Sequence, residues 1–121
     1  MTKYQNLEAW KVSMQLVKEI YFVTQKYLKT EQYGLVSQIR RAVISVPSNI
    51  AEGLGRQHKN DKIHFLHISR GSAHEVQTLL HISKMAGAIS EQDSREIFIL
   101  IDKTLRIING FINYMKESSP K

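Results

Sequence analysis

Residues 34–53 read GLVSQIRRAVISVPSNIAEG, and the spacing of their apolar side chains predicts a helix. At 100° per residue, one narrow stripe collects the apolar and small residues, and the opposite side is polar, as in a helix with one buried face. Pro47 removes a backbone donor inside this helix, so we expect either a kink or a break with Ser48 or Asn49 capping a new segment. The stripe consists of Leu35, Ile39, Ala42, Val43, Val46, Ile50 and Gly53.

Start and stop signals on either side of this segment divide the chain into four helices. We expect them over about residues 7–28, 31–56, 60–87 and 91–116. Because the connections are short, neighbouring helices should run antiparallel. The predicted fold class is therefore all-α, an antiparallel up-down-up-down four-helix bundle in one domain over residues 1–121. The signals are N-caps at Asn6, Thr30, Asn60 and Ser90, the last with Asp93 three residues on, and Gly87 as the residue that closes the third helix.

The four predicted helices differ in how much apolar surface they carry. The third has one narrow stripe: Leu66, Ser69, Ala73, Val76, Leu80 and Ser83. The first and fourth carry apolar side chains over about half their circumference, against roughly 100° for a helix with one buried face. Leu28 belongs to the first arc, and Ile107 and Tyr114 widen the fourth. Either the bundle covers more of these helices than usual, or their surplus faces form a patch for self-association.

Composition limits the classes of function. The chain has 121 residues, a net charge of +6 and no cysteine, which excludes disulfides, thiolate zinc sites and cysteine nucleophiles. The first residues lack the apolar core of a signal peptide, and no apolar run approaches the roughly 20 residues of a membrane span. We therefore expect a soluble, cytoplasmic protein without a membrane partner. The basic surplus favours polyanions such as nucleic acid.

The histidines are the strongest candidates for metal ligands. His67, His74 and His81 recur every seven residues, which places successive members roughly 10 Å apart, too far to share one ion. His64 and His67 are one turn apart, but no Glu-x-x-His pairing of the di-iron kind accompanies them. We interpret the row as exposed, with a charge that can change between pH 5 and 8 on a confined surface. We expect no metal, no cofactor and no catalytic residue.

A polar stripe lies opposite the apolar stripe of the second helix and includes Arg41 and Glu52. Glu75 of the third helix falls at the edge of its apolar arc, so we expect it to be half-buried and in need of a cation, Arg41 or Arg40. Arg41, Glu52 and Glu75 are therefore predicted to form a structural polar network between helices or subunits. The alternative is a row that contacts a polyanion.

Several motifs together resemble a known family. Residues 33–35 (YGL), 38–42 (QIRRA), 45–53 (SVPSNIAEG) and 71–75 (GSAHE), with the 7–10 opening (LEAW), resemble the four-helix-bundle proteins encoded in intervening sequences of bacterial 23S ribosomal RNA genes. The accessory proteins of diversity-generating retroelements are similar. The resemblance spans nearly the whole chain. It implies a bacterial bundle that assembles as a pentameric ring, a basic surface proposed to bind nucleic acid, and no enzymatic activity.

The leading hypothesis is a non-enzymatic, oligomeric protein that binds nucleic acid, with RNA as the expected partner, through backbone contacts. Few aromatic side chains are expected outside the core to stack on bases. The alternative is a protein-interaction scaffold or accessory subunit whose charge is incidental, and a metal-dependent bundle enzyme is a third class. The candidate contacts are Lys11 and Lys18, seven apart on one face of the first helix, then Arg41, and Arg40, Arg56, Lys59 and Lys62 around the far end of the second.

Overall fold

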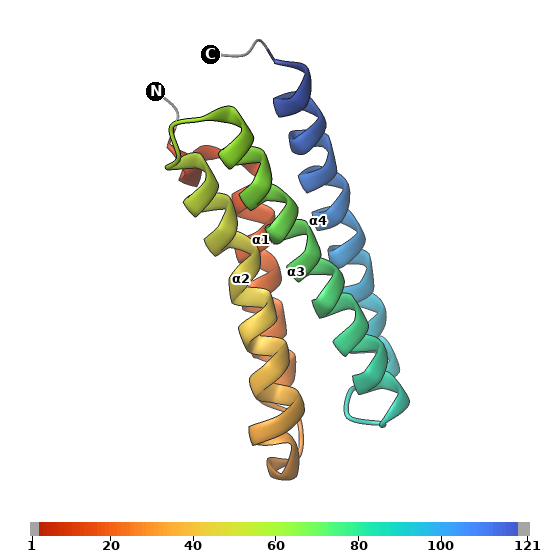
Figure 1. Cartoon of the computed structure of the whole chain (residues 1–121). Helices are drawn as coiled ribbons and strands as arrows, with labels where there is room; N and C mark the ends of the chain where they lie inside the picture. The colour runs from red at the N-terminus through yellow and green to blue at the C-terminus, as the bar shows by residue number, and fades with distance from the viewer. Residues whose placement is uncertain (1–2, 119–121) are drawn as a thin grey trace.

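The computed structural model describes residues 3–118, which form four long helices and no strand. They are α1 (Glu8–Thr24), α2 (Ser37–Leu54), α3 (Lys59–Met85) and α4 (Glu91–Glu117). Each helix packs against the next in the sequence, and α1 also packs against α4 (Figure 1). The prediction of an all-α chain with four helices is confirmed. Within residues 3–118, no helix combines the length and the apolar character needed to cross a membrane.

The core consists of aliphatic side chains that all four helices direct inward. The predicted stripes of the second and third helices are buried as expected, except that Leu35 is half-buried. Burying one such side chain stabilises the fold by roughly 1.5–3 kcal/mol, so this shared interior is what holds the helices together. The largest fully buried aliphatic side chains are Leu16, Ile20, Ile39, Ile50, Leu66, Leu80, Ile101, Ile108 and Ile112.

The connection between α3 and α4 follows the sequence signals closely. Gly87 has a φ of +73°, and its N–H and that of Ala88 donate to the carbonyls of Lys84 and Ser83, at 3.1 and 2.8 Å. This pair of bonds is a Schellman motif, which glycine favours because the left-handed backbone strains other residues. The Asp93 N–H donates to the Ser90 hydroxyl at 3.1 Å, so the predicted cap of α4 is confirmed.

The predicted limits of the first helix are wrong at both ends. Asn6 is not its cap, because its N–H donates to the Lys3 carbonyl inside a 3₁₀ turn over Tyr4–Asn6, and Leu7 takes the N-cap position. At the other end the chain leaves the helix after Thr24, so that Tyr27 is buried while Leu28 turns outward and is 73% exposed. Leu28 therefore does not belong to the apolar face of α1.

The predicted caps of the second and third helices are also wrong. Thr30 lies in a 3₁₀ turn over Lys29–Glu31, and a π-helical turn over Gln32–Val36 precedes α2. Gly34, a weak helix former, sits in this wider turn, which brings the Val36 side chain fully into the core. The cap position of α3 is His58 rather than Asn60, because the chain turns directly after the end of α2.

Pro47 lies inside a helix that continues past it, so the alternative of a break is wrong. Ser48 and Asn49 do not cap a new segment. The Ser48 hydroxyl donates to the Ile44 carbonyl, and the Asn49 amide donates to the Ser45 carbonyl, each at 2.8 Å. Both side chains thus bind backbone of the preceding turn and support the helix on either side of the missing donor.

Candidate nucleic-acid interface

Lys11 and Lys18 lie exposed on α1, two turns apart as their spacing predicts. Among the residues that the structure describes, neither ammonium group has an ion-pair partner. Arg41 of α2 is also exposed. These three cations are available to a polyanion without the loss of an internal ion pair.

The structure brings Arg56, Lys59 and Lys62 together where α2 meets α3. The Lys62 ammonium donates to the carbonyls of Leu54 and Arg56, at 3.3 and 2.5 Å. The Lys59 ammonium reaches across to α4 and donates to the Lys116 and Ser118 carbonyls, at 3.3 and 2.5 Å. Both amines therefore satisfy carbonyls at the negative ends of helices. We call Arg56, Lys59 and Lys62 the end cluster.

Arg56 has two partners of its own in the end cluster. Its guanidinium forms an exposed ion pair with Glu52 at 2.8 Å and stacks on the Phe65 ring, 4.6 Å from the ring centroid. An exposed pair of this kind contributes only a few tenths of a kcal/mol, so a phosphate can displace it at little cost.

Arg40 does not belong to this end of α2, contrary to the sequence-based expectation. It lies near the start of the helix, where its Nε donates to the Thr24 hydroxyl at 2.9 Å and its guanidinium covers the Tyr21 ring at 4.4 Å. A second guanidinium nitrogen donates to the Tyr21 carbonyl at 3.4 Å. Arg40 thus ties α2 to the last turn of α1.

Arg41, Glu52 and Glu75 are not all brought together. Arg41 and Glu75 line one shallow pocket between α2 and α3, but both are exposed, and no ion pair within residues 3–118 joins them. Glu75 is therefore not half-buried, because Ala42 and Ser45 are too small to cover it. Glu52, eleven residues beyond Arg41 and hence roughly 16 Å along the helix, pairs with Arg56 instead.

Besides the bond from Lys62 to Leu54, the hydrogen bonds that join α2 to α3 within residues 3–118 involve serines. The Ser45 and Ser72 hydroxyls are 2.8 Å apart, Asn49 donates to the Ser45 hydroxyl at 2.8 Å, and the Ser69 hydroxyl donates to the Val46 carbonyl at 2.7 Å. Sequence reasoning did not identify this network. The available signal was the run of small residues on the inner face of the third helix, which permits close approach.

The histidine row lies along the side of α3 that borders α4. His74 and His81 are exposed, and the His81 ring lies 4.5 Å from the Phe98 ring of α4. His67 is half-buried, and its Nδ1 accepts from Arg70 at 2.7 Å. Burial lowers the pKa of His67, and the nearby charges of Arg70, Lys116 and His64 lower it further. Across residues 3–118, no three histidine or acidic side chains cluster closely enough to hold a metal ion.

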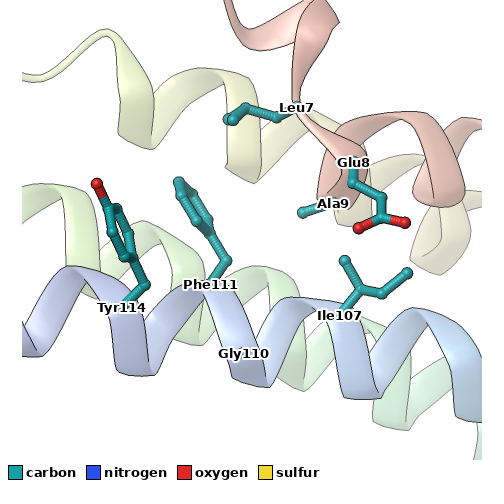
Figure 2. Close-up of a pocket in the computed structure, with 7 residues that line it drawn as sticks. All are labelled: Leu7, Glu8, Ala9, Ile107, Gly110, Phe111 and Tyr114. Atoms are coloured by element: carbon teal, nitrogen blue, oxygen red, sulfur yellow. The ribbon is translucent and has the colours of Figure 1, made fainter.

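An apolar groove of about 400 Å³ opens between the start of α1 and the second half of α4. Figure 2 shows the Phe111 and Tyr114 rings projecting from α4 on the side of Leu7, with Ile107 further along towards Ala9. Tyr114 is 66% exposed, as is Ile99 about four turns earlier on α4. The wide apolar arc of the fourth helix is thus only partly covered within one chain.

A second apolar groove, of about 300 Å³, lies on another side of α1, between α1 and α2. Its walls come from Trp10, Met14 and Val17 of α1 and from Ile44 and Pro47 of α2. The apolar surface of α1 that the core does not cover therefore lies in the groove beside α2. The corresponding surface of α4 lies in the groove beside the start of α1.

Aromatic side chains outside the core are more numerous than the sequence suggested. Phe22 and Tyr33 are exposed in addition to Tyr114, Tyr33 almost fully. Phe22 lies under the ammonium group of Lys26, 4.6 Å from its ring centroid. Rings with one free face of this kind are able to stack on unpaired bases.

Comparison with known proteins identifies the family. The model of the 23S rRNA-intervening sequence proteins matches residues 5–110 of the chain. A crystal structure of a protein of unknown function from the S23 ribosomal protein family of Bacteroides thetaiotaomicron is similar, with a TM-score of 0.80 and 19% identity, over 87% of this chain and 95% of that chain. No curated protein matches the sequence. The resemblance seen in the sequence motifs is confirmed, and the chain belongs to the 23S rRNA-intervening sequence protein family.

Proposed function

We propose that this protein is a non-enzymatic, oligomeric nucleic-acid-binding protein whose partner is RNA and whose contacts are to the phosphate backbone. The observation that carries the proposal is the pair of free, exposed ammonium groups at Lys11 and Lys18 on a chain with a net charge of +6. Phosphate contacts of this kind supply affinity that depends on salt and carries little sequence information.

The proposal includes assembly of several copies into a ring, which multiplies this charge. Its support is the presence of two different apolar grooves, one on each of two sides of α1. A contact between two different surfaces repeats from copy to copy and closes into a ring when the rotation allows. The number five comes from the family resemblance. The up-down-up-down order of the helices belongs to the same proposal and is supported by their short connections and shared neighbours.

The test is a titration of a structured RNA fragment at several salt concentrations. The slope of log K against log salt should become shallower by about 0.7–0.9 for each phosphate contact that is lost. The variant with both Lys11→Gln and Lys18→Gln should therefore show a slope reduced by roughly 1.4–1.8, at unchanged thermal stability.

A matched control removes the same charge elsewhere. Lys26→Gln with Lys29→Gln changes two exposed lysines near the connection between α1 and α2, of which Lys26 pairs with Asp93 at 3.1 Å. This pair should leave the slope close to that of the original protein. Equal slopes for the two double variants would contradict the assignment of Lys11 and Lys18 as contacts.

One observation favours a second candidate, a scaffold or accessory subunit whose charge is incidental. The groove between α1 and α4 is lined mostly by apolar residues, among them Leu7, Ile107 and Phe111, with Glu8 as its charged member, and it can receive an apolar side chain from another protein. The same titration separates the two functions. Binding of RNA at low salt supports the first, and no binding at low salt decides for the scaffold.

A further inference from the structure

The border between α3 and α4 carries a row of paired side chains along the molecular surface. Three contacts follow one another along α3 in the direction of its carboxyl end. Arg70 donates to Asn109 at 2.9 Å, Gln77 donates to Asp102 at 3.4 Å, and the His81 ring lies against the Phe98 ring. The residue numbers rise along α3 while those of the partners on α4 fall, so the two helices run in opposite directions along this border. His74 is consequently level with Leu105, which is next to Arg106.

In the half of this border that includes the start of α3 and the end of α4, most of the surface side chains are basic or carry an amide. On α3 this half contains His64, His67, Arg70 and His74, and on α4 it contains Arg106, Asn109, Asn113 and Lys116, each set spaced by three or four residues along one side of its helix. We call these eight residues the basic seam. Imidazole, guanidinium, ammonium and amide groups all donate to phosphate or sugar oxygens, as found in backbone contacts to nucleic acid.

Acidic groups lie at the edges of the basic seam rather than within it. Asp102 is one turn beyond Arg106 and accepts from Gln77, and Glu91 is occupied by Lys84 and Arg95 at 3.5 and 3.6 Å. Glu75 lies on the other side of α3, in the pocket shared with Arg41, and Glu117 follows Lys116 at the end of α4. Asp61, in the first turn of α3 and one turn before His64, borders the seam at the end nearest the end cluster. Among the eight residues of the basic seam itself, every charged group is cationic.

The basic seam is continuous with the end cluster. Lys59 donates to the carbonyl of Lys116, the last residue of the seam on α4. In Figure 1 the turn between α2 and α3 and the carboxyl end of α4 lie at the same end of the molecule. An extended polyanion bound at Arg56, Lys59 and Lys62 can thus continue along α3 and α4, with Asp61 and Glu117 as acidic groups that border this path.

Histidines make the charge of this surface depend on pH. A histidine becomes cationic within the range of about pH 8 to 5, and each protonated ring adds a phosphate donor. His67 also affects a neighbour: its Nδ1 accepts from Arg70 only while this nitrogen carries no proton. Protonation therefore frees one guanidinium nitrogen of Arg70, while the other keeps its bond to Asn109. Acidification therefore adds charge to the seam and frees one donor nitrogen of Arg70.

From this arrangement we infer that the basic seam binds an RNA backbone along its length, and that protonation of His64, His67 and His74 increases the affinity. The inference rests on the proposed function and adds to it a second contact surface and its regulation by pH. It differs from the predicted contacts at Lys11 and Lys18, which lie on α1. The group that the seam recognises is the phosphate backbone, and binding does not depend on the base sequence.

The experiment measures the salt slope of RNA binding at pH 7.5 and pH 5.5 with the full chain and a short RNA hairpin. For the original protein the slope should steepen on acidification by about 0.7–0.9 for each histidine that meets a phosphate. The variant with His64→Gln and His74→Gln, both exposed positions, should lose most of this difference. The variant with His64→Lys and His74→Lys should bind with the steep slope already at pH 7.5.

The matched control is His81→Gln, compared with His74→Gln alone, because His81 is an exposed histidine outside both the basic seam and the end cluster. This control should keep the pH dependence, and thermal melting at both pH values verifies that every variant is folded. A pH dependence equal in His74→Gln and His81→Gln, or none in the original protein, overturns the inference while RNA binding itself stands. Absence of binding at both pH values at low salt overturns the proposed function as well.

Discussion

Gly53 sets the distance between α2 and α3. A Cβ at this position would lie 2.9 Å from the Phe65 Cβ and 3.1 Å from the Lys62 carbonyl oxygen, neither of which is the free end of a flexible side chain. We predict that Gly53→Ala destabilises the protein by about 1–3 kcal/mol, the usual cost of overpacking. Urea unfolding measures the change.

Gly71 provides the matched control for that substitution. It also lies inside a helix, α3, but a Cβ there meets no atom within 4 Å. Gly71→Ala should therefore raise the free energy of unfolding by roughly 0.5–1 kcal/mol through helix propensity alone. Loss of stability in Gly71→Ala, or none in Gly53→Ala, would contradict the packing described for this pair of helices.

His67 predicts a pH dependence of stability. Its pKa is lowered in the folded protein, mainly by burial and then by Arg70, so the unfolded chain binds the proton more tightly. The stabilising contribution is present above the unfolded pKa and is lost as the pH falls through the folded pKa. The free energy of unfolding should therefore fall between pH 7.5 and pH 5, and His67→Gln should show a smaller fall. An equal or larger fall in this variant contradicts the assignment.

At the residue scale, the sequence identified the cations of the candidate interface but not their partners. Lys59 and Lys62 have the charge and spacing of phosphate contacts, yet both donate to helix-end carbonyls that are distant in the sequence or across a turn. Glu75 was expected to be half-buried because its place on the helix was known while the size of its neighbours on α2 was not. Helical periodicity predicts the side of the helix on which a side chain lies, but the extent of its burial depends on how the neighbouring helices pack.

The element scale is best tested at the connection between α3 and α4. Gly87 has a left-handed backbone, which costs an ordinary L-residue roughly 1–2 kcal/mol. We predict that Gly87→Ala lowers the free energy of unfolding by about this amount and that Gly87→Asn lowers it less, because asparagine tolerates this conformation better. Chemical denaturation of both variants measures the difference, and equal losses would contradict the conformational explanation.

Helix limits were predictable where a local motif defines them and not where tertiary contacts do. Ser90 and Gly87 bind backbone groups within a few residues, so their roles follow from the sequence alone. The end of α1 depends instead on the burial of Tyr27 and on Arg40, which arrives from α2. The π-helical turn before α2 likewise depends on the fit of Val36 into the core.

At the scale of the whole molecule, the exposed apolar side chains of α4 bear on assembly. Ile99 is 66% exposed and Ile107 lines the groove of about 400 Å³. We predict that Ile99→Glu or Ile107→Glu shifts the protein to smaller species, because a buried, unpaired carboxylate opposes association. Lys29→Gln lowers the net charge by the same amount at an exposed site and should leave the mass unchanged. Sedimentation velocity compares the three variants.

The sequence predicted that apolar surface would remain uncovered, but not where it would lie. The wide arcs of the first and fourth helices suggested one merged patch. The structure has one groove between α1 and α4 and another between α1 and α2, because Met14 and Trp10 point towards Ile44 and Pro47. Two separate surfaces suit a repeated contact between unlike faces better than a two-fold dimer.

The central claim is that several copies of this chain together bind RNA, and one measurement tests both parts. Light scattering during size-exclusion chromatography is applied to the protein at micromolar concentration and low salt, alone and with a structured RNA. The account predicts about five times the 14.0 kDa of one chain for the protein alone, and a heavier species that contains RNA for the mixture. A 14.0 kDa monomer that elutes apart from the RNA would contradict it.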